Sequence, residues 1–246
     1  MTGLYREDLA YVHDAGYGAT ARAGAAVLLE ALRRGPPSGL VIDLGCGSGI
    51  LSERVAAAGY DVLGVDLSGD LLALARKRVP GGRFRRGSLW NTELPPCIAV
   101  AAVGEVVNYL FDGGARQGPG KLFRRVHAAL PPGGPFLLDL AGPGRLAGAG
   151  RARHWAEGED WAVLVSAEED RERRLLTRRI TTFRRVGAAY RRDDEVHRQR
   201  LYPPADAAAL LREAGFRVRV LRGYGKLRFA RGVAGFLARR PGGRTD

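Results

Sequence analysis

Residues 40–52, L-V-I-D-L-G-C-G-S-G-I-L-S, decide the fold of this chain. The first five residues are apolar apart from Asp43 and predict a buried strand, and the last residues predict a helix. Between them stand Gly45, Gly47 and Gly49, which let the backbone take positive φ angles and let a ligand approach without meeting a Cβ atom. The stretch therefore predicts a strand, a turn open to a ligand, and a helix whose first amides face the same space.

A second carboxylate follows at the end of the next predicted strand. Residues 61–65, D-V-L-G-V, lead to Asp66, which stands 23 residues after Asp43. In the dinucleotide-binding fingerprint the turn is G-x-G-x-x-G, and an acid about twenty residues later binds a ribose. This chain has the acid, but its turn is G-x-G-x-G. A lone glycine turn would be explained as a simple link between strand and helix, whereas two acids in register favour a cofactor site.

An acid before a shortened glycine turn and an acid after the second strand resemble the class I S-adenosylmethionine-dependent methyltransferases. In that family the first strand is followed by D/E-x-G-x-G-x-G, which Asp43, Gly45, Gly47 and Gly49 match in full. The resemblance implies S-adenosyl-L-methionine as the cofactor, with the turn close to its methionine and ribose parts. It also implies that Asp43 orders this region through the α-amino group or a water, and that Asp66 binds both ribose hydroxyls.

From this turn onward, helix and strand signals alternate as in a doubly wound α/β fold. The resemblance implies a Rossmann-like sheet of seven mostly parallel strands, with N-terminal helices and an antiparallel β insertion that forms a lid. Three segments between 151 and 202 alternate with period two and supply the insertion. The expected organisation is a helical cap at 1–38, a cofactor-binding core at 39–150, the insertion at 151–202, and the rest of the core at 203–246.

The resemblance implies further cofactor contacts around the turn and the following strands. Cys46 lies in the turn and Leu67 directly follows the second acid. Ser88 and Leu89 follow a short strand at 83–86, where many family members carry an acid that contacts the adenine amino group. Adenine recognition is therefore expected to rest on the Ser88 hydroxyl, on Leu89 and on backbone amides.

The N-terminal segment supplies candidates for lid or substrate contacts, because in this family it often lies over the cofactor cleft. Each candidate could instead serve only to pack its helix onto the sheet, and Tyr11 is the candidate that is assigned to the site. The candidates are Tyr5, Tyr11, His13 and Tyr17.

Candidate catalytic groups come from a strand end and from the insertion. Ligands of open α/β sheets bind beyond the carboxyl ends of the strands, which puts Glu105 at the mouth of the site, as a cofactor contact and as a candidate base. His154 and His197 are the other candidate bases, since a histidine pKa suits proton transfer near neutral pH. Glu195 and His197 share one face of the last insertion strand. They either face the substrate or satisfy each other's hydrogen-bonding groups, and both hypotheses stay open.

The expected function is methyl transfer to an oxygen or nitrogen of a small metabolite. Residues 104–110, G-E-V-V-N-Y-L, hold no D/N-P-P-Y/F, the motif of family members that act on the exocyclic amines of DNA bases. An RNA-directed methyltransferase and a non-catalytic binder of the cofactor are the alternatives. The methyl acceptor, the atom methylated and the oligomeric state stay open.

The net charge of +13 invites a nucleic-acid partner. Residues 151–246 hold most of the excess, with 23 basic and 13 acidic side chains against 16 and 13 in residues 1–150. Because acids interrupt the basic residues, nucleic acid is not the expected partner. If residues 151–202 roof the acceptor pocket, their basic charge is expected to serve an anionic or carboxylate-bearing small-molecule acceptor through arginine forks.

The composition of the chain, with 46% hydrophobic and 26% charged residues, is typical of a globular protein. No apolar run reaches the roughly 18 residues of a membrane span, and the first residues do not form a signal peptide. A soluble cytoplasmic protein without a membrane partner is expected. Cys46 and Cys97 are too few for a disulfide framework, and the four scattered histidines give no metal-binding spacing.

Overall fold

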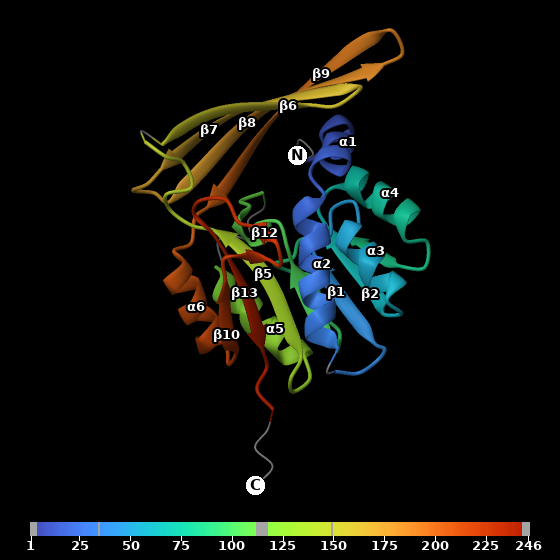
Figure 1. Cartoon of the computed structure of the whole chain (residues 1–246), viewed down its shortest axis with the longest axis vertical. Coiled ribbons are helices and arrows are strands. Elements are labelled where there is room, and N and C mark those ends of the chain that lie inside the picture. Colours follow the sequence, from blue (N-terminus) through green and yellow to red (C-terminus); the bar gives the residue numbers. More distant parts are fainter. Residues whose placement is uncertain (1–3, 34, 112–117, 149, 243–246) are drawn as a thin grey trace.

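The chain forms a central α/β unit with a second, antiparallel sheet across one end (Figure 1). The structure is a computed structural model that describes residues 4–33, 35–111, 118–148 and 150–242. Residues 1–3 and 34 of the expected N-terminal cap lie outside the described residues. None of the helices in these ranges is long and apolar enough to cross a membrane.

Seven strands form the central sheet, in the order β10-β13-β5-β4-β1-β2-β3. Their bounds are β1 (Leu40–Leu44), β2 (Asp61–Asp66), β3 (Arg83–Arg86), β4 (Ala99–Ala102), β5 (Pro135–Ala141), β10 (Arg217–Leu221) and β13 (Val233–Arg239). Strands β1 to β5 run parallel, whereas β13 runs antiparallel to both β5 and β10. The strand order reverses between β1 and β4. In open α/β sheets, ligands bind at such a reversal, beyond the carboxyl ends of the strands.

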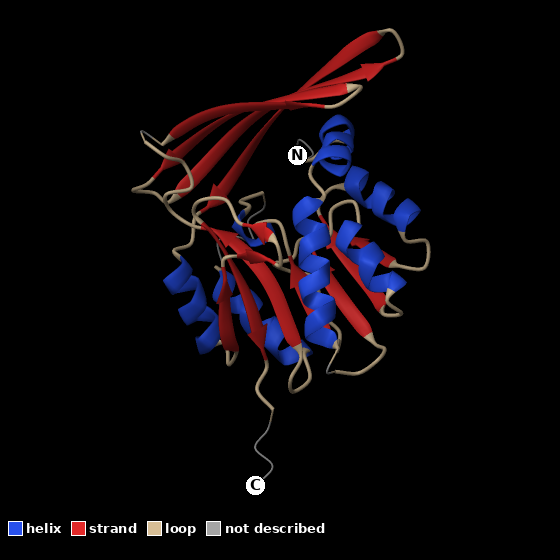
Figure 2. Cartoon of the chain, viewed as in Figure 1, coloured by secondary structure: helices blue, strands red, loops and turns tan. Residues whose placement is uncertain are grey.

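Helices cover both faces of this sheet (Figure 2). One face carries α2 (Ala19–Leu32), α3 (Ile50–Ala57) and α4 (Gly69–Arg78), and the other carries α5 (Pro119–Ala129) and α6 (Pro204–Glu213). Alternate residues of β1 enter different cores, because Val41 packs with α2 and α3 while Ile42 and Leu44 pack with α5 and α6. Burial on both faces explains why this strand is almost entirely apolar. The expected doubly wound, mostly parallel seven-stranded sheet is confirmed.

The second sheet contains four antiparallel strands in the order β6-β7-β8-β9. Their bounds are β6 (Arg151–Glu157), β7 (Trp161–Asp170), β8 (Leu175–Val186) and β9 (Ala189–Arg200). The alternation of β9 is as predicted, with Glu195, His197 and Gln199 buried and Val196 exposed on the other face. Strand β6 was not predicted, because most of its side chains are exposed and its period-two signal is weak.

Helix α1 (Glu7–Gly16) packs on the antiparallel sheet, whereas α2 packs on the central sheet. Leu9 and Val12 share a hydrophobic cluster with apolar residues of β7 and β8. Asp8, only 4% exposed, accepts hydrogen bonds of 2.5 and 2.6 Å from Arg191 on β9. The backbone amides of Tyr5 and Arg6 donate to the Glu195 carboxylate at 2.8 Å. The expected cap at 1–38 is thus divided between two sheets.

The two sheets are joined at the 3-10 helix η1 (Val106–Asn108). The fully buried Asn108 amide donates to the carbonyls of Ala141 in β5 and Arg200 in β9, and its oxygen accepts from the Ala141 amide. A short hairpin, β11 (Gly223–Tyr224) and β12 (Leu227–Arg228), completes the fold beside α2. Because Asn108 bonds to strands of both sheets, it fixes the space between them.

Candidate active site

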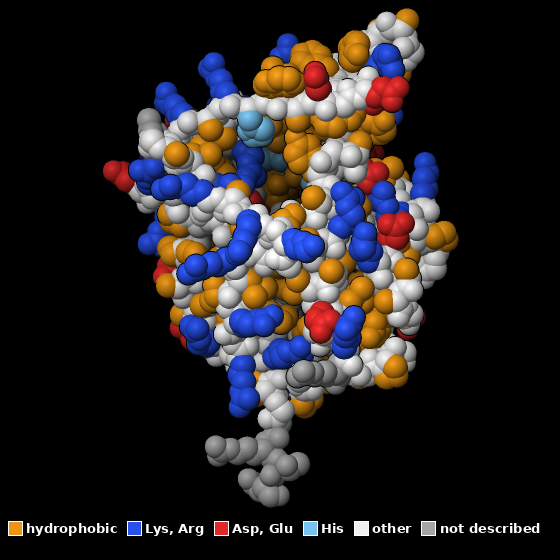
Figure 3. Space-filling model, in the orientation of Figure 1, with side chains coloured by type: hydrophobic (Ala, Val, Ile, Leu, Met, Phe, Trp, Pro, Cys, Tyr) orange, Lys and Arg blue, Asp and Glu red, His pale blue; other side chains and the backbone are white. Residues whose placement is uncertain are grey.

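Two adjoining pockets lie beyond the carboxyl ends of the central strands, and Figure 3 shows the surface hollowed below the antiparallel sheet, with basic side chains and a histidine at the hollow. The Asp66 pocket includes Asp66, Leu67, Ser88 and Leu89. The Arg178 pocket includes Asp43, Cys46, Glu105, Arg145, His154 and Arg178. The residues that line both are Tyr5, His13, Gly45, Gly47, Val103, Gly104 and Tyr109. The pockets therefore meet at the glycine turn.

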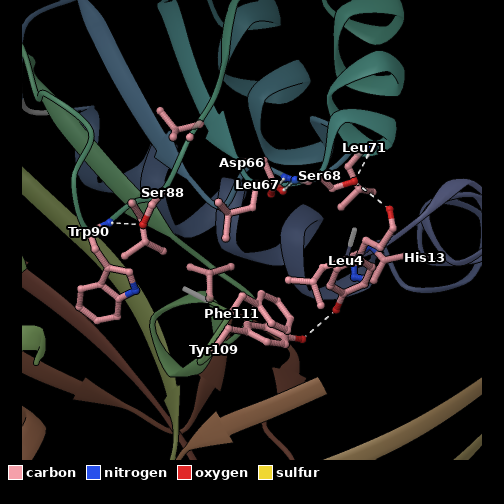
Figure 4. Close-up of a pocket in the computed structure, with 18 of the residues that line it drawn as sticks. Leu4, His13, Asp66, Leu67, Ser68, Leu71, Ser88, Trp90, Tyr109 and Phe111 are labelled. Carbon is pink, nitrogen blue, oxygen red and sulfur yellow. Dashed lines mark hydrogen bonds between the residues drawn. The ribbon is translucent and has the colours of Figure 1, made fainter. Parts of the chain in front are cut away.

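Asp66 stands at the end of β2 and lines its pocket next to Ser68 (Figure 4). Its carboxylate accepts hydrogen bonds of 2.9 Å from the amides of Gly47 and Ser68. Burial raises the pKa of this carboxyl. Each carboxylate oxygen has a second lone pair, so the group can also accept hydrogen bonds from a ligand.

The glycine turn approaches the pockets as its sequence predicts. Gly45 has a φ of 69°, and a Cβ there would come within 2.5 Å of Val106. Gly47 has a φ of 54°, and a Cβ there would meet no atom within 4 Å. Because Gly47 lines both pockets, a side chain at this position would project into ligand space.

Three other members of the motif have different surroundings. Asp43 is 3% exposed and accepts a 2.8 Å hydrogen bond from the Ser52 hydroxyl, and burial raises its pKa to about 7. Burial raises the pKa of the Cys46 thiol well above its usual value, so it stays protonated. Gly49 lines neither pocket, because it packs against Ala75 of α4.

The Arg178 pocket contains a compact ionic cluster. Glu105 binds Arg145 at 3.1 Å and Arg178 at 3.4 Å, and both arginines are 20% exposed. Partial burial and the charges of these two arginines lower the pKa of His154 on β6. The carboxylate of Glu105, the expected base, is therefore occupied by ion pairs with two arginines. His154 keeps a neutral imidazole at the pocket wall.

The backbone of Glu105 is held by Asp139 of β5. The Asp139 carboxylate accepts from the amides of Gly104 at 3.0 Å and Glu105 at 2.6 Å, and from the Tyr224 hydroxyl at 2.8 Å. Glu105 has a φ of 58°, an uncommon conformation for a residue with a side chain. Burial raises the pKa of Asp139 to about 6. This turn is a fixed part of the pocket floor.

Tyr11, assigned to the cofactor site from the sequence, lies outside both pockets. Its hydroxyl donates to Asp160 at 2.9 Å, and the Arg184 guanidinium lies 3.9 Å from its ring centroid. These partners turn the ring toward the antiparallel sheet. The candidates that reach the pockets are Tyr5, His13 and Tyr17.

His197 also lines neither pocket. It is 1% exposed, its Nε2 lies 2.8 Å from Glu195, and its ring lies 4.8 Å from that of Tyr5, centroid to centroid. The sequence left two hypotheses open for this pair. The geometry favours the one in which Glu195 and His197 satisfy each other's hydrogen-bonding groups. The pair contacts Tyr5, because Glu195 accepts a hydrogen bond from its amide and His197 packs against its ring.

Three residues of the Arg178 pocket were not predicted from the sequence, namely Arg145, Arg178 and Asp139. Arg178 follows the inward alternation of Leu176 and Ile180 on β8, so an arginine on an apolar face was a usable signal. Asp139 stands within an otherwise apolar strand, P-F-L-L-D-L-A, which is a similar signal. Arg145 lies in a loop with no comparable pattern.

The chain is similar to known methyltransferases. Residues 41–134 match the family described as "Methyltransferase domain". A putative methyltransferase, YqeM of Bacillus subtilis, is 26% identical over 192 residues, 74% of this chain and 75% of that protein. Trans-aconitate 2-methyltransferase of Rhizobium etli is 31% identical over 197 residues, 76% and 69% of the two chains. An S-adenosylmethionine-dependent methyltransferase from Clostridium acetobutylicum superimposes with a TM-score of 0.79 at 20% identity, covering 95% and 98%.

We predict that Gly47→Ala abolishes binding of S-adenosylhomocysteine while the protein stays folded. Gly59→Ala is the matched control, because Gly59 also has a positive φ and open space but lies outside both pockets. Both substitutions cost about 1–2 kcal/mol of backbone strain. Calorimetry should show lost binding only for Gly47→Ala, and equal affinity for both variants would mean that the turn is purely structural.

Asp66→Ala should weaken S-adenosylhomocysteine binding by about 1–3 kcal/mol, the usual cost of leaving buried hydroxyl partners unpaired. Asp61→Ala, at the exposed start of the same strand, should leave the affinity unchanged. Isothermal titration of both variants measures the difference. A folded Asp66→Ala protein with native affinity would remove Asp66 from the ribose role.

His197→Ala should lower the free energy of unfolding by about 1–3 kcal/mol, since it leaves the buried Glu195 carboxylate without one partner. The turnover per folded molecule should change little. Arg198→Ala, on the exposed face of β9, is the control. Urea unfolding and methyl transfer are measured on one preparation, and lost turnover at native stability would restore the catalytic reading of His197.

Proposed function

Because this chain belongs to the S-adenosylmethionine-dependent methyltransferases, we propose that its methyl acceptor is a small metabolite that carries a carboxylate. The methyl group goes to an oxygen or a nitrogen of that metabolite. The carboxylate of the acceptor binds in the Arg178 pocket. The cofactor binds in the Asp66 pocket and presents its methyl group to the acceptor where the two pockets meet.

The observation that carries this proposal is the arginine pair of the Arg178 pocket. Arg145 and Arg178 share a single carboxylate, that of Glu105, and Arg228 lines the same pocket. Arg145 also has a buried Nε with no hydrogen-bond partner. A guanidinium presents a planar fork of donors that matches a carboxylate. Donors that Glu105 leaves unused are therefore available to an anionic acceptor.

The residues of the Asp66 pocket fit the cofactor of this family. Asp66 has acceptor capacity for hydroxyl groups, Gly47 leaves space where a Cβ would stand, and Ser88 and Leu89 line the far end. S-adenosylmethionine supplies an electrophilic methyl group on a positive sulfonium. This chain's residues bind and align the reactants, which supplies much of the rate in a direct displacement.

The antiparallel sheet contributes only to the acceptor side. His154, Val163, Val165, Arg178 and Ile180 line the Arg178 pocket, whereas the residues of β6 to β9 in the described structure are absent from the lining of the Asp66 pocket. This division supports a lid that selects the acceptor. The name of the Rhizobium etli relative supports a carboxylate, because trans-aconitate is a tricarboxylate.

A panel of carboxylic acids tests this function, with each acid paired with its uncharged amide. Hydroxy acids, amino acids and polycarboxylates are supplied with S-adenosylmethionine, and S-adenosylhomocysteine formation is measured. Turnover of acids but not of amides is expected. Equal turnover of amides, or turnover of RNA alone, would contradict the proposal.

Arg178→Gln should raise KM for the acid found in this panel by about tenfold or more, since it removes a charge-assisted hydrogen bond. The affinity for S-adenosylhomocysteine should stay unchanged. Arg179→Gln is the matched control, because Arg179 is the next residue of β8 and faces solvent. An unchanged KM in Arg178→Gln would remove this arginine from acceptor binding.

A further inference from the structure

The junction of the two pockets contains an unsatisfied histidine nitrogen. Within the described structure, the polar side chains that line both pockets are those of Tyr5, His13 and Tyr109. The Tyr5 and Tyr109 hydroxyls bond to each other at 2.8 Å. Nδ1 of His13 is buried and has no hydrogen-bond partner. Since buried polar atoms are rarely left unpaired, this nitrogen needs an explanation, and a ligand is the simplest one.

His13 is held in place by packing. It lies on α1, where Leu9 and Val12 are buried in the cluster shared with the antiparallel sheet. Its ring meets the Tyr5 ring edge-on, with centroids 5.1 Å apart, and Figure 4 shows both His13 and Tyr109 directed into the Asp66 pocket. The neighbouring Asp14 binds Arg78 of α4 at 2.9 Å, which anchors the end of the helix to the central unit.

We propose that His13 is the catalytic base, which takes the proton from the reacting hydroxyl or amine of the acceptor. This inference rests on the proposed function. Arg145 and Arg178 line the Arg178 pocket but not the Asp66 pocket, so a carboxylate that they bind lies on the acceptor side of the junction. A second group of the same molecule then reaches the junction beside His13. The acceptor class is therefore a hydroxy acid or an amino acid.

The proposed step balances in atoms and charge. A lone pair of the acceptor oxygen or nitrogen forms the new bond to the methyl carbon. The carbon–sulfur bond breaks, and its electron pair stays on sulfur, which becomes a neutral thioether. The proton of the acceptor group passes to the imidazole of His13 and from there to solvent.

The surroundings of His13 keep its imidazole neutral. Burial lowers the pKa of His13 to about 4, and the charge of Asp14 opposes this effect while that of His197 adds to it. The lone pair is therefore available at neutral pH. As the methyl group leaves, the positive charge of the sulfonium disappears, so a protonated His13 becomes less unfavourable during the step. The titratable groups that face His13 from the packed elements are Tyr5, Asp14, Tyr17, Tyr109 and His197.

His13→Gln tests the proposal, because glutamine retains a hydrogen-bonding side chain but cannot take up the proton. With the hydroxy or amino acid found in the panel, kcat should fall about 10²–10⁴-fold, the usual contribution of a general base. KM for that acid and the dissociation constant of S-adenosylhomocysteine should stay unchanged. His127→Gln, on α5 against Phe216, is the control.

A second readout does not depend on activity. In the ¹⁵N-labelled native protein, the His13 imidazole signals should shift when S-adenosylhomocysteine and the acid are added together, and those of His127 should not. Three results would overturn the proposal: a native kcat in His13→Gln, unshifted His13 signals, or turnover confined to acids whose carboxylate itself is methylated. Lack of turnover of every acid by the native protein would instead contradict the proposed function, and this inference with it.

Discussion

Aspartates at or near the ends of three strands bind the segments that form the site. Asp43, Asp66 and Asp139 end or nearly end β1, β2 and β5. Burial raises the pKa of all three, so each ionised carboxylate is costly in the folded protein. Hydrogen bonds from neighbouring loops, from α3 and from β11 offset part of this cost. The donors are Ser52, the amides of Gly47, Ser68, Gly104 and Glu105, and Tyr224. The loops are thus shaped before a ligand binds.

The sequence predicted the part of this arrangement that lies within short motifs. Asp43, the glycine turn and Asp66 stand within 24 residues, and the family pattern relates them directly. Asp139 was not predicted, because its partners, Gly104 and Glu105, lie 35 and 34 residues earlier in the chain. Only the pairing of β4 with β5 brings this strand beside the turn that follows β4. A pattern within one strand cannot reveal which backbone amides a buried carboxylate will hold.

The N-terminal segment shows the same limit more clearly. Helical spacing predicted a helix near the right place, but its partners are about 150 to 190 residues away in the sequence. Glu195 holds the backbone at Tyr5, and Asp160 holds the Tyr11 hydroxyl. These contacts decide that Tyr5 rather than Tyr11 faces the pockets. The choice between two tyrosines on one segment depends on tertiary partners that periodicity does not identify.

Glu105 connects the two halves of the molecule physically. Asp139, in the central sheet, holds the backbone of Glu105 at a φ of 58°. The Glu105 carboxylate in turn binds Arg145 and Arg178. The arginines therefore take their positions from the cofactor-binding unit, although Arg178 belongs to the antiparallel sheet. The antiparallel sheet and α1 have a hydrophobic cluster of their own, so their remaining surface can vary without disturbing the central core. A fold built this way can keep one cofactor site and change its acceptor, as expected where function depends on residues carried by a common fold.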